Sequence, residues 1–200
     1  MFDYFGEKEL EKQMAFKAKR DAFLKKPVQF LTNFGVKPNH ITIFAVVLFF
    51  IACGVVMEHP VIGGLLGFIY CLLDGLDGPL ARYQKIDSKA GSLMDIFADQ
   101  VGIIVLPILS VIYFDTNFVF AYIFGLFYIV EIFLLTILNA IKIPFGFVLR
   151  VKYVYYGLFL LCTFIKTDLL VYFHVVFGGY YLIHSIFLYF KLINFYKHSR

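Results

Sequence analysis

Four aspartates gather in one stretch of a chain that is otherwise strongly apolar. The stretch reads DGLDGPLARYQKIDSKAGSLMDIFAD. Asp74, Asp77, Asp95 and Asp99 lie in or beside its two apolar segments, whereas Asp87 lies in the polar loop between them. Ionisable side chains at membrane depth are costly, so they are functional candidates by default. At about 4 Å and an effective dielectric constant near 20, each like-charge pair costs roughly 4 kcal/mol. A positive group must therefore lie among the aspartates, and one or two divalent metal ions are the simplest candidate.

The residues around these aspartates suit a phosphate ligand. Carboxylate oxygens favour Mg²⁺, Mn²⁺ or Ca²⁺ over zinc or copper. Gly78 leaves its backbone open to a ligand, and the guanidinium of Arg82 can fork onto a phosphate. Ala81 and Gly91 are small residues in the same stretch. The pattern therefore favours phosphoryl or phosphatidyl transfer at a membrane surface.

The composition indicates an all-α integral membrane protein. Of the 200 residues, 61% are hydrophobic, and the mean hydropathy is +0.82. Such long apolar runs predict membrane spans. The six expected spans are Ile41 to Met57, Val61 to Leu80, Leu93 to Phe114, Phe118 to Asn139, Val154 to Ile165, and Leu169 to Phe190.

Basic residues accompany apolar ones at the N-terminal end of the chain. Residues 1 to 27 therefore predict an amphipathic helix on the membrane surface. The net charge of +4 is modest, and the basic cluster favours attraction to anionic lipid over nucleic-acid binding. The expected organisation is an N-terminal juxtamembrane segment, a six-helix catalytic domain and a cytoplasmic tail, at residues 1–40, 41–190 and 191–200.

Charge placement predicts that both termini are cytoplasmic. With six spans, all but one of the 18 lysine and arginine residues fall on the side of the termini, Lys166 being the exception. Cytoplasmic loops carry such an excess of positive charge. Spacings of three and four residues keep each aspartate pair on one helical face. The two pairs then meet near the cytoplasmic ends of spans two and three.

This spacing resembles the signature of a known family. The pattern D-x2-D-G-x2-A-R-x8-G-x3-D-x3-D, from Asp74 to Asp99, resembles that of the CDP-alcohol phosphotransferases, which are integral membrane enzymes of phospholipid synthesis. The stretch Pro38-Asn39-His40-Ile41-Thr42 resembles the P-N-x-x-T that opens the first span in that family. Six spans, an N-terminal surface helix and a site on the cytoplasmic side are also similar to that family.

The resemblance implies a metal-dependent transfer reaction. The four aspartates would hold a two-metal centre with Mg²⁺ or Mn²⁺, and Asp99 would also be the general base on the acceptor hydroxyl. The acceptor oxygen would attack the β-phosphorus of CDP-diacylglycerol, and CMP would leave. The resemblance also implies residues that bind the CDP part of the donor, namely Gly78, Ala81, Arg82, Gly91, Asn39 and Thr42.

The acceptor is a small polar alcohol whose identity stays open. Arg150 and Lys152 precede the fifth span and either hold a phosphate on the acceptor or set topology. Their R-x-K spacing is similar to a basic pair in family members that use glycerol 3-phosphate, which is our first expectation. Glu131, inside the fourth span, either positions the acceptor or forms a structural pair. Inositol phosphate, inositol, serine and choline are the alternatives.

A function of another class is transport of a cation bound by the aspartates. Transport predicts carboxylates near the bilayer midplane and a path to both faces, whereas this sequence gathers them at one face beside Arg82. A non-catalytic relative of the family is a further alternative. The resemblance implies a homodimer, and the expected location is a bacterial inner membrane or an organelle membrane.

Overall fold

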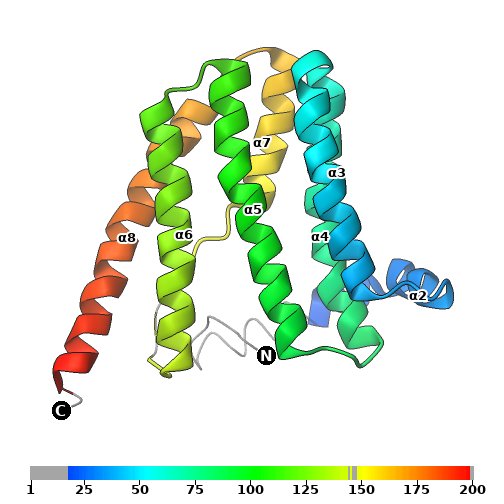
Figure 1. The fold of residues 1–200 in the computed structure, drawn as a ribbon, viewed down its shortest axis with the longest axis horizontal. Helices are drawn as coiled ribbons and strands as arrows, with labels where there is room; N and C mark the ends of the chain where they lie inside the picture. Colours follow the sequence, from blue (N-terminus) through cyan, green and yellow to red (C-terminus); the bar gives the residue numbers. More distant parts are fainter. Residues whose placement is uncertain (1–17, 144, 146–147, 199–200) are drawn as a thin grey trace.

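The regular elements of the protein are helices throughout the part that the structure describes. The computed structural model describes residues 18–198 except 144, 146 and 147. Residues 18–23 are helical, and the helices that follow are shown in Figure 1. They are α2 (Lys25–Asn33), α3 (Pro38–Glu58), α4 (Pro60–Tyr83), α5 (Lys89–Phe114), α6 (Phe118–Ala140), α7 (Lys152–Ile165) and α8 (Leu170–His198).

Five of these helices are long and apolar enough to cross a membrane. They are α3, α4, α5, α6 and α8, and they correspond to five of the six predicted spans. Helix α7 corresponds to the remaining one but has only 14 residues. At about 1.5 Å per residue it reaches roughly 21 Å, against a hydrocarbon core of about 30 Å. The predicted span from Val154 to Ile165, and with it the total of six spans, therefore stays a prediction.

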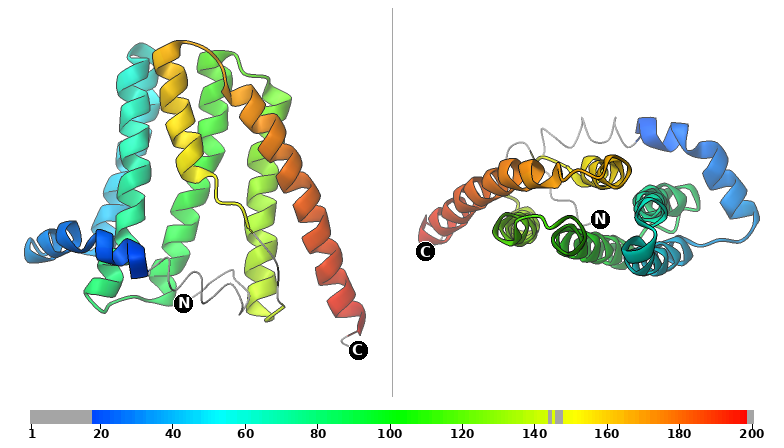
Figure 2. Two further views of the ribbon diagram at one scale, coloured as in Figure 1. Left: turned by 180° about the vertical axis from the view of Figure 1, so that it is seen from behind. Right: turned by 90° about the horizontal axis from the view of Figure 1, so that it is seen from above.

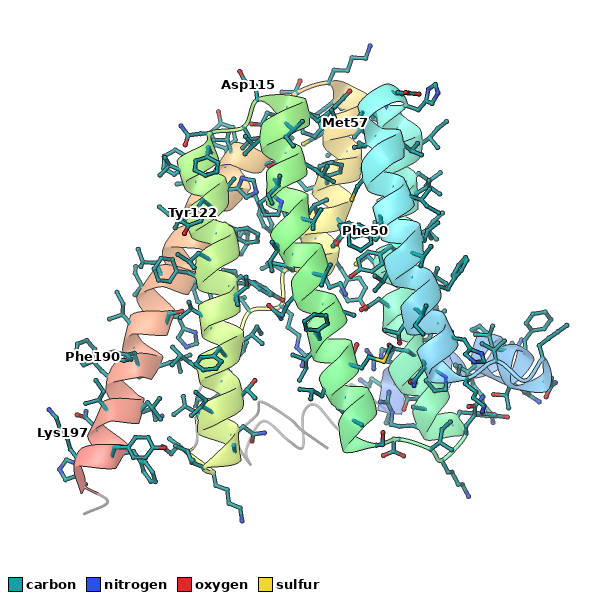
Figure 3. The ribbon with its side chains drawn as sticks, viewed as in Figure 1. Phe50, Met57, Asp115, Tyr122, Phe190 and Lys197 are labelled. Carbon is teal, nitrogen blue, oxygen red and sulfur yellow. The ribbon has the colours of Figure 1, made fainter. Side chains whose placement is uncertain are left out.

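The outer surface of the bundle carries large apolar side chains. Phe50, Tyr122 and Phe190, labelled in Figure 3, have exposed fractions of 55%, 56% and 58%. They come from α3, α6 and α8. Soluble proteins rarely expose contiguous apolar surface on this scale, so the bundle is built for contact with lipid.

Short loops join the helices at the end of the bundle that holds Met57 and Asp115 (Figure 3). Asp115 ends α5 in the left-handed region at φ 58°, and the side chain of Asn117 caps α6 by accepting from the N–H of Val119. Lys197 marks the opposite end (Figure 3). The start of α3 and the end of α8 therefore lie at the same end of the bundle, and the placement of both termini on the cytoplasmic side stays a prediction.

Close packing between α3 and α4 depends on a glycine. A Cβ atom at Gly63 would lie 2.4 Å from the Cα of Val56, much closer than non-bonded carbon atoms can approach. Small residues allow such backbone contact between membrane helices. The two helices can therefore run side by side, as Figures 1 and 2 show, toward the end where α4 carries its aspartates.

Helix α2 leaves the bundle sideways near this same end (Figure 1). Val28 is buried with Ile41 of α3 and Leu80 of α4, while Phe23 and Phe30 are exposed. The helix therefore has one apolar face on the protein and another that is uncovered. The first 17 residues of the predicted amphipathic helix lie outside the described residues, so that helix as a whole stays a prediction.

We predict that Gly63→Ala destabilises the protein by about 1–3 kcal/mol, because the added methyl group would overpack the contact between α3 and α4. The measurement is the temperature at which the purified protein in detergent loses its single size-exclusion peak. Gly54→Ala is the matched control, since a Cβ atom at Gly54 has no atom within 4 Å. Equal shifts for the two variants would contradict the prediction.

Candidate active site

One cavity of about 590 Å³ lies at the end of the bundle where α4 finishes and α5 begins. Small-molecule sites commonly have volumes of about 300–1,000 Å³. The cavity is also lined by the start of α3, the segment before α7, and Arg20. It brings together most of the residues that the sequence singled out, namely Asn39, Thr42, Asp74, Asp77, Gly78, Ala81, Arg82, Gly91, Asp95, Asp99, Arg150 and Lys152.

Three of the four aspartates form a compact cluster in this cavity. Asp74, Asp95 and Asp99 each present a carboxylate oxygen, and these atoms lie within 4.8 Å of one another. The i, i+4 spacing of Asp95 and Asp99 puts both on one face of α5, and that face meets α4 at Asp74. The buried Oδ1 of Asp74 has no hydrogen-bond partner among the described residues. Hard oxygen ligands and an unused acceptor fit a divalent metal ion.

Asp77 is held differently from the other three aspartates. Its Oδ2 accepts a hydrogen bond of 2.7 Å from the hydroxyl of Thr42, and its Oδ1 accepts one of 2.6 Å from the N–H of Gly78. Thr42 lies in the first turns of α3, so this bond joins α3 to α4. Thr42 therefore lines the cavity and also forms a hydrogen bond to an aspartate. Its contact with a nucleotide, which the family resemblance implied, stays a prediction.

Lys152 supplies a positive charge inside the aspartate cluster. Its ammonium group donates hydrogen bonds to Oδ2 of Asp74 and to Oδ1 of Asp99. It also lies 5.3 Å from the ring centroid of Tyr70, a distance at which an aromatic face attracts a cation. The sequence argument required a cation here and suggested a metal ion, whereas the structure puts a lysine between two carboxylates. The acceptor-binding role of Lys152 stays a prediction.

The position of Lys152 follows from the late start of α7. The segment between α6 and α7, where the structure describes it, is not helical, and Figure 2 shows α7 beginning partway along the bundle. The carbonyl of Leu149 in this segment accepts a hydrogen bond of 3.1 Å from the hydroxyl of Tyr181. Non-helical backbone at membrane depth is tolerated where it is buried in protein or lines a cavity. Leu149 and Arg150 of this segment line the cavity, so they meet the second condition.

Two tyrosines pack beneath the cluster. Tyr70 donates a hydrogen bond of 3.2 Å to the carbonyl of Ala98 in α5, and its ring lies 5.5 Å from that of Tyr156. A Cβ atom at Gly102 would lie 2.7 Å from the hydroxyl of Tyr70 and 2.5 Å from that of Tyr156. Glycine at this position therefore lets both rings approach α5 directly below the aspartates.

Arg82 is held by a residue that the sequence analysis did not single out. Its Nε and Nη2 donate hydrogen bonds of 2.7 Å to the two carboxylate oxygens of Asp21. Arg20, beside Asp21, also lines the cavity. No spacing rule links these residues, because Asp21 and Arg82 are 61 positions apart. From the basic composition of the N-terminal segment we predicted only a helix on the membrane surface, and no contact with Arg82.

Glu131 lies away from the described lining of the cavity. It is buried, with an exposed fraction of 1%, and its Oε2 lies 3.2 Å from Nδ1 of His184 in α8. The structure thus brings Glu131 of α6 beside His184 of α8, and its role as a structural pair stays a prediction. Its assignment to the acceptor site stays a prediction.

The comparisons with known proteins agree with the signature. The family model described as CDP-alcohol phosphatidyltransferase matches residues 36–193, which is most of the chain. No curated protein matches the sequence. The matched region begins just before α3 and includes the four aspartates, but it leaves out Arg20 and Asp21.

We predict that Lys152→Met lowers the thermal stability of the protein when divalent ions are chelated. Removing one partner of a buried ion pair costs about 3–5 kcal/mol, because the carboxylates of Asp74 and Asp99 would then repel each other without compensation. Excess Mg²⁺ should restore part of the loss. The measurement is the unfolding temperature of purified protein with chelator and then with Mg²⁺. Lys197→Met is the control, since Lys197 is exposed. An unchanged unfolding temperature in chelator would contradict the prediction.

Proposed function

Because the chain belongs to the CDP-alcohol phosphatidyltransferase family, we propose that it transfers a phosphatidyl group from CDP-diacylglycerol to a small polar alcohol and releases CMP. The family implies phosphatidyl transfer from a CDP-alcohol, and CDP-diacylglycerol is our assignment within that class. The observation that carries the proposal is that all eight positions of the aspartate signature line one and the same cavity.

The aspartates are the proposed ligands of Mg²⁺ or Mn²⁺. Asp74, Asp95 and Asp99 would hold one ion through the oxygens that lie within 4.8 Å of one another, and Asp77 would complete a site for a second ion. Divalent ions bound there would neutralise the negative charge of the diphosphate as its bond is cleaved. Thr42 keeps the carboxylate of Asp77 turned toward the start of α3.

Asp99 is the proposed general base. It takes the proton from the acceptor hydroxyl, and the acceptor oxygen forms a bond to the β-phosphorus. The bond between that phosphorus and the bridging oxygen breaks, and CMP leaves with the oxygen and its electron pair. Lys152 donates a hydrogen bond to Oδ1 of Asp99 and so fixes the orientation of its carboxylate at the cavity. The cavity borders the membrane surface, where an alcohol from water and a lipid-linked donor can meet.

Glycerol 3-phosphate is the acceptor that we propose first. Arg150 and Lys152 line the same cavity as the aspartates, and basic side chains at this position can bind the phosphate of the acceptor. The first turn of α7 adds N–H groups at the same place. Inositol phosphate would use the same basic pair, whereas inositol, serine and choline would not need it.

The apolar helices and the family indicate an integral membrane protein. We propose that the cavity faces the cytoplasm, because Lys166 is the one basic residue expected at the opposite end. A bacterial inner membrane is the proposed location. The family resemblance also leads us to propose a homodimer.

We predict that purified protein releases CMP from CDP-diacylglycerol when glycerol 3-phosphate and Mg²⁺ or Mn²⁺ are present, and that chelation abolishes the release. Asp99→Asn should lower kcat by roughly 10²–10⁴-fold, the range for loss of a general base. Asp115→Asn is the control, since Asp115 lies at the far end of the bundle in a left-handed conformation that asparagine adopts readily.

The assay measures CMP, and mass spectrometry identifies the lipid product for each acceptor in turn. Full turnover by Asp99→Asn would refute the role of Asp99. No CMP release with any acceptor would refute the proposed reaction. A product with inositol or serine alone would keep the reaction but replace the acceptor.

We predict that Arg150→Gln raises KM for glycerol 3-phosphate roughly tenfold or more, because a hydrogen bond to a charged group is lost. The KM for CDP-diacylglycerol should stay unchanged. Steady-state CMP release at varied concentrations of each substrate separates the two constants. Lys142→Gln is the control, since it removes a positive charge from the start of the same segment. A rise in the donor KM alone would place Arg150 on the donor side instead.

A further inference from the structure

The helical residues 18–23 lie against the cavity although they precede the region that matches the family. Figure 2 shows this dark-blue segment beside the lower end of α4. Arg20 lines the cavity together with the aspartates, and Asp21 is hydrogen-bonded to Arg82. The segment therefore contributes two charged side chains to the site.

Asp21 uses only one edge of the Arg82 guanidinium. The hydrogen bonds to Asp21 come from Nε and Nη2. The remaining nitrogen, Nη1, lies 3.3 Å from the point where a Cβ atom of Gly78 would be. Two parallel hydrogen bonds fix the plane of a guanidinium group. The carboxylate of Asp21 thus directs Nη1 toward Gly78 and the cavity.

Arg20 also lies close to the Cβ position of Gly78. Its Nη2 lies 3.6 Å from the Cβ position of Gly78, and its buried Nε has no hydrogen-bond partner among the described residues. The two guanidinium groups therefore converge on one glycine, and Asp21 is hydrogen-bonded to one of them, that of Arg82. An anion held over Gly78 would satisfy both arginines, because a side chain is missing there and the backbone is accessible.

We propose that Arg20 is a second arginine of the donor site, which binds the diphosphate of the CDP-linked substrate together with Arg82, and that Asp21 is a positioning residue for Arg82. This inference rests on the proposed function. A diphosphate carries acceptor oxygens on both phosphorus atoms, and each arginine can fork onto one of them. Donor binding then requires the N-terminal segment to be docked against α4.

The direct test is the affinity of purified protein in detergent for CDP with Mn²⁺, measured by isothermal titration calorimetry. Arg20→Gln should weaken CDP binding roughly tenfold or more, and Arg20→Lys should recover part of the affinity. Lys19→Gln is the matched control, because it removes the same charge from the adjacent, exposed position. It should bind CDP as the unaltered protein does.

Steady-state kinetics separates the donor from the acceptor. Arg20→Gln should raise KM for CDP-diacylglycerol and leave KM for the acceptor unchanged. Asp21→Asn should raise the donor KM in the unaltered protein but add nothing in an Arg82→Gln background, and Asp21→Glu should retain more affinity than Asp21→Asn. A purely structural role for Asp21 would lower stability equally in both backgrounds.

Three outcomes would overturn the inference. Unchanged CDP affinity and unchanged donor KM in Arg20→Gln would exclude Arg20 from the donor site. Loss of binding to vesicles containing anionic phospholipid, with CDP affinity intact, would assign Arg20 to membrane lipid. Absence of CMP release and of CDP binding in the unaltered protein would refute the proposed function itself, whereas activity that is insensitive to Arg20 would refute only this inference.

Discussion

Mutual repulsion among carboxylates at the edge of a membrane is the constraint on which the site depends. Asp74, Asp95 and Asp99 lie too close to carry three uncompensated charges. In the structure the positive charge of Lys152 offsets this repulsion, because its ammonium group donates hydrogen bonds to two of them, Asp74 and Asp99. A lysine at the first position of α7 therefore ties α7 to both α4 and α5. The same arrangement leaves Oδ1 of Asp74 without a hydrogen-bond partner in the part of the chain that the structure describes, so the cluster retains an acceptor for a metal ion.

Helix α7 begins partway along the bundle (Figure 2), and residues of the non-helical segment before it line the cavity. The segment before it is fixed by the bond from Tyr181 to Leu149 and brings Arg150 to the cavity. Irregular backbone in a membrane protein is tolerated where it lines a cavity, as Leu149 and Arg150 do.

Attachment of the N-terminal segment to the bundle positions a residue of the site. Asp21 holds Arg82 through two short hydrogen bonds, and Val28 packs on Ile41 and Leu80 a few residues further along. Exposed phenylalanines on the same segment, such as Phe30, offer an apolar surface to lipid. The orientation of the Arg82 side chain therefore depends on the docking of this segment on the bundle.

The sequence by itself determined the features that depend on local spacing along the chain, namely where the long helices lie and which residues share a helical face. Apolar length predicted the five long membrane helices, and the spacing of three and four residues placed the aspartates on facing sides of α4 and α5. Only the tertiary structure decided which side chains meet across the bundle. It put Lys152 between two aspartates, Asp77 on Thr42, and Glu131 beside His184. Such contacts join residues tens of positions apart, so they depend on how helices cross and where α7 begins, and no repeating pattern in the chain encodes them.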